Sequence, residues 1–213
     1  MYLNGENNEM SLILSYHTSE FGLVCSDSRV SRRLPDGSYQ AIPGEAAKKF
    51  IALRPGLVLA GSSNISGQMD YVLFDAVRSH VQANPGCNYD SVADHVQKAA
   101  LDTFGPYASA DVSLHLIGFD PKQYRIRSQS CHLAESRCER GECESGLIIS
   151  GFVEKHETRP LAQKLFAMIA GDRCLQTVHR SMLALAQEIE QTRTEPVIGP
   201  PYHFHAVTTE QTR

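Results

Sequence analysis

The sequence predicts an α+β fold, a four-layer α-β-β-α sandwich in which two antiparallel sheets lie between two pairs of helices. The expected elements follow one another as strands, a helix pair, strands, a second helix pair and a final strand, and this order suits two sheets with helices on their outer faces. The length of 213 residues and the 42% apolar composition suit one domain with a substantial core. No internal repeat, linker or low-complexity tract divides the chain, so residues 1–213 are expected to form that single domain.

The first two strands are expected to form a hairpin. Residues 12–17, LILSYH, alternate as one strand of an antiparallel pair does, and after a short polar turn residues 21–25, FGLVC, form the returning strand. The returning strand carries Asp27 and Arg29 back beside the start of the first strand. One hairpin therefore brings charged groups next to the hydroxyl group of Ser11.

Apolar spacing and turn residues predict the remaining elements. The segment 31–47 is rich in turn-forming residues and is expected to be a hairpin or a long loop. The second helix of the first pair is expected to be capped by Asp90 or Ser91 and to end before Gly105. The other expected elements are strands at about 48–53, 57–61, 111–118, 123–130, 146–150 and 201–208, and helices at about 66–81, 158–170 and 172–192.

The spacing of cysteine and histidine residues predicts neither a metal site nor a cofactor. Three of the six cysteines lie in the stretch 131–143, but their irregular spacing is unlike the close pairs of a zinc site. This stretch is therefore expected to be a solvated, reduced loop. Cys25 and Cys174 lie in apolar contexts and are expected to be small core residues. His203 and His205 have the i, i+2 spacing of a metal pair, yet strand histidines without a metal are commoner.

Bulk properties exclude several classes of function. The net charge of −4 is unlike the basic surface that nucleic-acid-binding proteins carry. No run approaches the roughly 18 apolar residues of a membrane span. The first ten residues, MYLNGENNEM, are polar and acidic, unlike a secretory signal. No nucleic-acid or membrane partner is therefore expected, and the expected location is the cytoplasm.

Five short motifs occur in one order across nearly the whole chain. They are Asp27-Ser28-Arg29 sixteen residues after Ser11, Lys48-Lys49-Phe50-Ile51, Leu59-Ala60-Gly61-Ser62, VSLHLIGFD at 112–120 and GPPYHFHAV at 199–207. In this order they resemble the proteasome family of N-terminal-nucleophile hydrolases, in particular its β-type subunits and the bacterial HslV peptidase. The resemblance implies the four-layer fold of that family.

The resemblance also implies a role for each matching residue. Ser11 takes the position of the nucleophile, whose own free α-amino group acts as general base. Asp27 takes the position of the carboxylate, and Lys49 that of the lysine that lowers the proton affinity of the amine and the hydroxyl. The backbone N–H of Gly61 would stabilise the oxyanion, and Arg29 would help to bind the substrate.

Several positions depart from the family's pattern. Ser11 replaces a threonine, and ten residues precede it, where a propeptide or a misassigned start would stand, so that its nitrogen is a non-basic amide. Cleavage after Met10, or translation from Met10 followed by its removal, would free the amine. By the same resemblance, Ser150 and Glu195 complete the site, although the glutamate replaces an aspartate. Ile198 stands where the family usually has a serine.

The residues leave three functions open. The leading interpretation is a subunit of a self-compartmentalising peptidase: a threonine-type site with serine in place of threonine, in stacked homo-oligomeric rings, acting on peptides or unfolded proteins, with an ATP-dependent unfoldase as partner. The alternative is a catalytically inactive proteasome-like homo-oligomer with a structural or binding role, which the serine at position 11 and Ile198 favour. A third is an amide hydrolase of the same superfamily that acts on small molecules. The insertion 32–43 is expected to line the pore or the substrate groove.

Overall fold

The computed structural model describes most of the chain, in which strands and helices alternate in groups. The described residues are 11–34, 36, 38–46, 49–63, 69–107, 110–134, 137–143, 146–151, 155–193 and 198–209. In chain order the elements are β1 (Leu12–His17), β2 (Phe21–Ser26), β3 (Arg29–Arg33), β4 (Tyr39–Ala46), β5 (Phe50–Arg54), β6 (Leu57–Ser63), the π-helix η1 (Met69–Phe74), α1 (Asp75–Ala83), α2 (Tyr89–Phe104), β7 (Asp111–Asp120), β8 (Arg125–Ala134), β9 (Arg137–Cys143), β10 (Gly146–Gly151), α3 (Lys155–Met168), α4 (Leu175–Thr192) and β11 (His203–Thr208).

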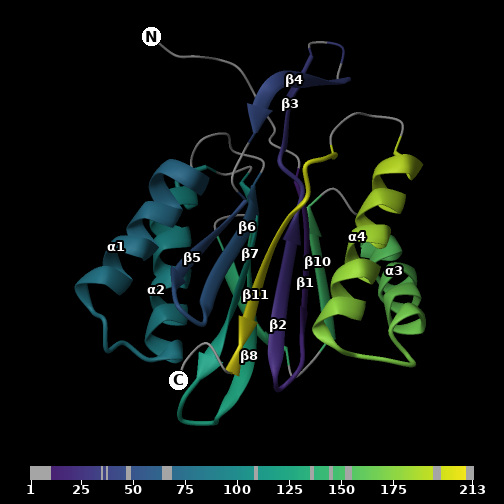
Figure 1. Cartoon of the computed structure of the whole chain (residues 1–213). Helices are drawn as coiled ribbons and strands as arrows, with labels where there is room; N and C mark the ends of the chain where they lie inside the picture. The colour runs from purple at the N-terminus through teal and green to yellow at the C-terminus, as the bar shows by residue number, and fades with distance from the viewer. Residues whose placement is uncertain are drawn as a thin grey trace.

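The strands pair antiparallel in two larger sheets and one two-stranded ribbon. The four-stranded sheet has the order β10-β1-β2-β11, and the five-stranded sheet has the order β5-β6-β7-β8-β9. The ribbon, β3 and β4, extends beyond the ends of both sheets (Figure 1). Helices α1 and α2 lie outside the five-stranded sheet, and α3 and α4 lie outside the four-stranded sheet (Figure 1). This mixed α+β arrangement of antiparallel sheets and outer helix pairs agrees with the prediction from the order of the elements.

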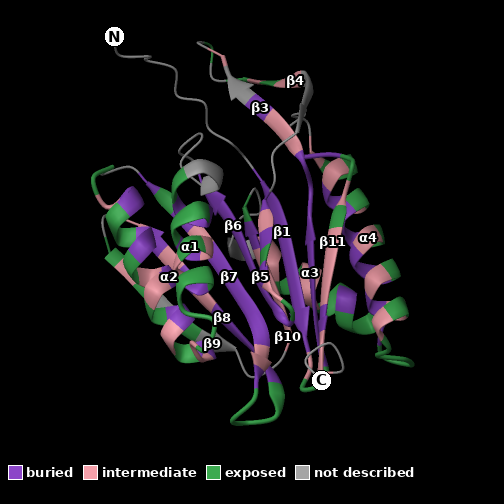
Figure 2. Ribbon diagram, turned by 60° about the vertical axis from the view of Figure 1, so that its left-hand side comes forward, coloured by how far each residue is buried: buried purple, intermediate pink, exposed green. Residues whose placement is uncertain are grey.

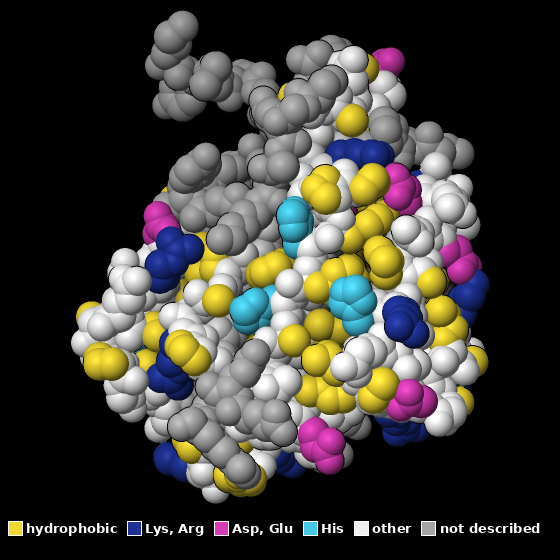
Figure 3. Space-filling model, viewed as in Figure 1, with side chains coloured by type: hydrophobic (Ala, Val, Ile, Leu, Met, Phe, Trp, Pro, Cys, Tyr) yellow, Lys and Arg dark blue, Asp and Glu magenta, His cyan; other side chains and the backbone are white. Residues whose placement is uncertain are grey.

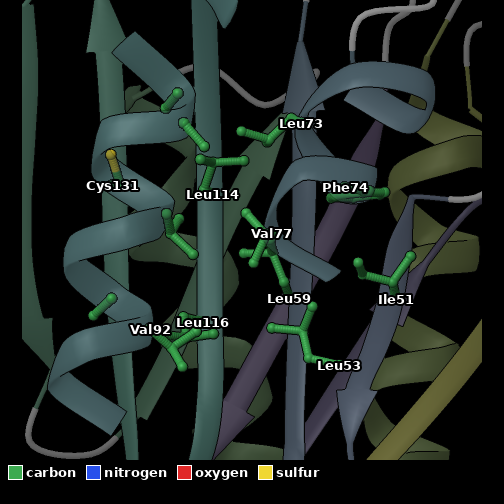
Figure 4. Packing of buried hydrophobic residues seen from close by; sticks show 14 of the residues in the cluster. Ile51, Leu53, Leu59, Leu73, Phe74, Val77, Val92, Leu114, Leu116 and Cys131 are labelled. Atoms are coloured by element: carbon green, nitrogen blue, oxygen red, sulfur yellow. The ribbon is translucent and has the colours of Figure 1, made fainter. Parts of the chain in front are cut away.

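Three clusters of buried apolar side chains hold these layers together. The first joins the five-stranded sheet to α1 and α2, where Leu59 of the sheet lies near Val77 of α1 and Leu116 lies near Val92 of α2 (Figure 4). The second joins the four-stranded sheet to α3 and α4, and the third fills the space between the two sheets. In Figure 2 the strands of both sheets are largely buried, whereas the outward-facing parts of the helices are exposed. Both sheets are therefore covered on both faces.

The first hairpin shows how the alternation in the sequence works in this fold. Leu12 and Leu14 belong to the cluster beneath α3 and α4, whereas Ile13 belongs to the cluster between the sheets. All six residues of β1 are buried. Because side chains of a strand alternate between its faces, Ser15 and His17 share the inter-sheet face with Ile13. The alternation thus separates two buried faces rather than a buried face from an exposed one.

The starts of three helices differ from the prediction, and one of them is α3, which begins at Lys155 rather than at about residue 158. Asn88, not Asp90 or Ser91, caps α2: it has an extended backbone, and its side chain accepts the N–H of Ser91. The predicted cap lies inside the helix because Asn88 satisfies a free N–H of the first turn two residues earlier than expected. Helix α4 begins at Leu175, after an extended Cys174, rather than at residue 172.

The cysteine-bearing stretch is not the predicted solvated, reduced loop. Strand β8 continues to Ala134, β9 returns beside it, and Cys131 and Cys138 form a disulfide between the two strands. The irregular spacing of the cysteines suggested a loop, but β9 is the edge strand of its sheet, where charged side chains such as those of RCERGEC are common. Cys25 is buried, as predicted. Cys174, the residue directly before α4, is exposed, so its assignment to the core was wrong.

Candidate functional site

A buried carboxylate at the end of β2 is the centre of the candidate site. One oxygen of Asp27 accepts the N–H of Leu12 at 2.8 Å and the Nζ of Lys49 at 2.9 Å, and the other accepts the N–H of Arg29 at 3.2 Å. The backbone N–H of Gly199 also favours the charged form of Asp27 and so acts to lower its pKa. The N–H of Asp27 in turn donates to the carbonyl of Leu12 at 3.2 Å. The hairpin therefore joins Asp27 to the residue that directly follows Ser11, as the sequence predicted.

Lys49 enters the site from the other sheet, just before β5. Its side chain is 4% exposed and that of Asp27 is 0% exposed, so the ion pair is removed from water. The Nζ of Lys49 also donates to the carbonyl of Arg29 at 3.0 Å. Burial raises the pKa of the Asp27 carboxyl, while the Lys49 ammonium and the N–H groups of Leu12 and Gly199 act in the opposite direction. The charge of each partner thus depends on the other, because either alone would be costly to bury.

Ser11 is buried at the edge of this cluster, against strand β10. A Cβ atom on Gly151 would overlap the carbonyl oxygen of Ser11, and Gly151 has a φ of +100°, so only glycine fits beside the serine. Ser150 and Ser26 lie directly opposite Ile13 on the two neighbouring strands, and all three therefore share the inter-sheet face. Both hydroxyls are buried and have no hydrogen-bond partner among the described residues. The space between the sheets is therefore lined with hydroxyl groups at the Ser11 end.

Gly61 lies beside Lys49, but its N–H group is used within the sheet. This N–H donates to the carbonyl of Lys49 at 2.9 Å. This bond joins β6 to Lys49, the residue before β5, and it fixes the position of the Lys49 backbone. The amide that was expected to face an oxyanion thus has a partner of its own.

The segment before β11 contacts the Asp27 turn through groups that the sequence did not single out. Arg29 donates from Nη1 to the carbonyl of Ile198 at 2.6 Å, and the hydroxyl of Ser28 donates to the carbonyl of Pro201 at 3.0 Å. Ile198 is buried. It stands where the resemblance implies a serine hydroxyl, and it contributes its backbone carbonyl instead. Glu195 lies outside the described residues. Glu190 contacts Arg29, and Tyr202 contacts Glu190. No motif or spacing indicated Glu190, and the motif that contains Tyr202 assigned it no role.

A hollow of about 360 Å³ lies elsewhere on the molecule, between α4 and β11. Figure 3 shows apolar side chains gathered around histidines on the side of the sandwich where β11 and α4 lie. The hollow is lined by Leu23, Leu175, Gln176, His179, Arg180, Phe204 and Ala206. Leu23 precedes Asp27 by four residues of extended chain, about 13 Å at 3.3 Å per residue, and neither Asp27 nor Lys49 lines the hollow.

The described residues hold no group of three or more histidine, cysteine or acidic side chains that could bind a metal ion. Along the same residues, no helix is long and apolar enough to cross a membrane. A comparison of the chain with models of known protein families finds no match. A search among curated proteins finds no similar sequence either. The geometry around Ser11 and Asp27 is therefore the evidence that bears on function.

Proposed function

We propose that the chain is a proteasome-like N-terminal-nucleophile peptidase that hydrolyses peptide bonds through Ser11. One observation supports this most strongly: a buried Lys49–Asp27 ion pair is hydrogen-bonded to the amide that follows Ser11. A buried lysine needs a functional or structural reason, since a charged side chain is rarely placed in an apolar interior. Here it lies where positive charge would lower the proton affinity of the Ser11 amine and hydroxyl.

The reaction follows from the free α-amine of Ser11. The amine takes the proton of the hydroxyl as Oγ attacks the peptide carbonyl, and the resulting ammonium then protonates the departing amine. This leaves an ester between Ser11 and the acyl part of the substrate. A water molecule, activated by the same amine, hydrolyses the ester and restores the enzyme. An α-amino pKa near 8 needs only a small reduction for proton transfer at neutral pH, and the Lys49 ammonium acts in that direction.

This mechanism requires the removal of residues 1–10. While Met10 precedes Ser11, the nitrogen of Ser11 is an amide and cannot accept a proton. We propose that cleavage after Met10, or initiation at Met10 followed by its removal, exposes the amine. The mature chain would adopt the N-terminal-nucleophile fold and assemble into stacked homo-oligomeric rings in the cytoplasm, with an ATP-dependent unfoldase supplying unfolded substrate.

An inactive proteasome-like assembly is the second candidate function. The N–H of Gly61 donates to Lys49 and is not free for an oxyanion, which favours this candidate. Ile198 contributes no hydroxyl to the site. The ion pair of Asp27 and Lys49 would then be a structural element that joins the two sheets.

Intact mass and N-terminal sequencing of the protein expressed from the full reading frame test the proposal first. A chain that begins at Ser11 and hydrolyses fluorogenic peptides supports it, and Ser11→Ala should then reduce hydrolysis by about 10³-fold or more. Ser19→Ala, in the exposed turn of the same hairpin, is the matched control and should leave hydrolysis unchanged. A homogeneous chain that begins at Met1, forms oligomers on native mass spectrometry and hydrolyses no peptide would support the inactive assembly instead.

A further inference from the structure

Two residues that were not expected to belong to the site, Glu190 and Tyr202, lie beside Arg29. The guanidinium donates from Nη2 to Glu190 of α4 at 3.4 Å, and the hydroxyl of Tyr202 donates to the other carboxylate oxygen of Glu190 at 2.7 Å. We call Arg29, Glu190 and Tyr202 the Arg29 clamp. It joins three segments that are far apart in the sequence: the turn after β2, the last turns of α4 and the chain before β11.

The clamp holds the residue that hydrogen-bonds both partners of the buried ion pair. The backbone N–H of Arg29 donates to Asp27 at 3.2 Å, and the backbone carbonyl of Arg29 accepts the Nζ of Lys49 at 3.0 Å. The guanidinium of Arg29 donates to the buried carbonyl of Ile198. A Cβ atom on Gly199 would overlap the guanidinium, so Arg29 also packs directly against the backbone at this glycine. The position of the Arg29 backbone thus depends on where its guanidinium is held.

The charges and hydrogen bonds of the clamp fix the position of the Arg29 guanidinium. Arg29 and Glu190 are about three-quarters buried, with side chains 25% and 28% exposed. Burial, together with the hydrogen bond and the charge of Glu190, raises the pKa of Tyr202, so its hydroxyl remains a donor. Glu190 therefore accepts from both sides, and its carboxylate fixes the direction in which the guanidinium points.

We infer that Glu190 and Tyr202 are positioning residues that act through the Arg29 guanidinium to keep the backbone N–H of Arg29 directed at Asp27. An effect of the clamp on catalysis rests on the proposed function, because Asp27 supports the nucleophile only if Ser11 reacts. The hydrogen bond to Asp27 itself can be measured in any case.

The first test measures amide hydrogen exchange in the full chain by NMR. Glu190→Gln keeps the shape of the side chain and removes its charge, and it should accelerate exchange of the Arg29 amide by about 10-fold, as the loss of a charge-assisted hydrogen bond would. Tyr202→Phe removes only the hydroxyl and should accelerate the same exchange less. Glu188→Gln, on the same helix but paired with Lys164 at the surface, is the control and should leave it unchanged. Equal exchange in Glu190→Gln and the wild type would overturn the inference.

The second test measures peptide hydrolysis by the chain that begins at Ser11. This chain contains every residue of the three buried apolar clusters. Glu190→Gln should lower kcat by about 10- to 100-fold with KM unchanged, since a displaced carboxylate support affects the chemical step rather than binding. Glu190→Asp should restore part of kcat. Unchanged kcat in Glu190→Gln would overturn the inference even if exchange is faster, because the clamp would then be structural only. A wild-type chain without hydrolysis would instead refute the proposed function, and the exchange comparison would still support or overturn the clamp.

Discussion

One buried hydrogen bond between the two sheets, between Ser15 and His115, should make the stability of the protein fall in mild acid. Ser15 of β1 and Nδ1 of His115 of β7 lie 2.7 Å apart in the interior, and His115 is fully buried. Burial lowers the pKa of His115 to about 4, because the charged imidazolium would lose its hydration there. The unfolded chain retains a histidine pKa of about 6.5.

The sign and the size of the effect follow from these two values. Since the pKa is lower in the folded state, the unfolded chain binds the proton first as the pH falls. The stabilisation is therefore fully present above about pH 6.5 and is lost progressively between about pH 6.5 and pH 4. With these values the free energy of unfolding should fall by about 2 kcal/mol from pH 7 to pH 5 through His115 alone. Other groups titrate in the same range, so a difference between two proteins is the useful quantity.

His115→Asn isolates this contribution. Asparagine keeps a polar atom near the position of Nδ1 but does not titrate, so the variant is expected to be less stable at pH 7 and to lose about 2 kcal/mol less than the wild type on going to pH 5. Urea unfolding at both pH values, followed by circular dichroism, measures the four free energies. Equal losses in the two proteins would refute the reasoning, since they would show that His115 takes up its proton in the folded state as easily as in the unfolded one.

Three further changes test the site and the core by urea unfolding. Lys49→Met should cost about 3–5 kcal/mol because it leaves the Asp27 carboxylate buried without its partner, whereas Lys122→Met, in the exposed β7–β8 turn, should have little effect. Gly151→Ala should cost more than about 2 kcal/mol, because its φ is positive and its Cβ would meet the Ser11 backbone, and Gly86→Ala, which meets no atom, is its control. Reduction of the β8–β9 disulfide should cost about 2 kcal/mol through the short loop that it closes, and equal stability with and without reductant would contradict this.

The parts of the site that the sequence predicted are those that depend on local pairing. A hairpin with a short turn leaves little choice of register, so the ladder that pairs Ile13 with Ser26 also brings Asp27 to the amide of Leu12. The order of helices and strands likewise predicted which elements cover the sheets. These features follow from residues close together in the sequence.

Several predictions failed where a residue's surroundings come from distant segments. The stretch at β9 was expected to be a loop because the irregular spacing of its cysteines does not distinguish an edge strand from a loop. Cys174 was assigned to the core from its apolar neighbours, but at the start of α4 it faces solvent. No spacing rule could relate Glu190 to Arg29, since 161 residues separate them.

The sequence by itself determined the α+β class, the first hairpin and the presence of a hydroxyl, a carboxylate and a lysine that could act together. Alternation and turn residues encode these features through residues that are close together in the sequence. Only the tertiary structure decided that Lys49 crosses from the other sheet to Asp27, that the Gly61 N–H is used by Lys49, and that Arg29 is held by Glu190. These contacts form only when the two sheets and α4 pack together, because burial is what makes each charge require its particular partner.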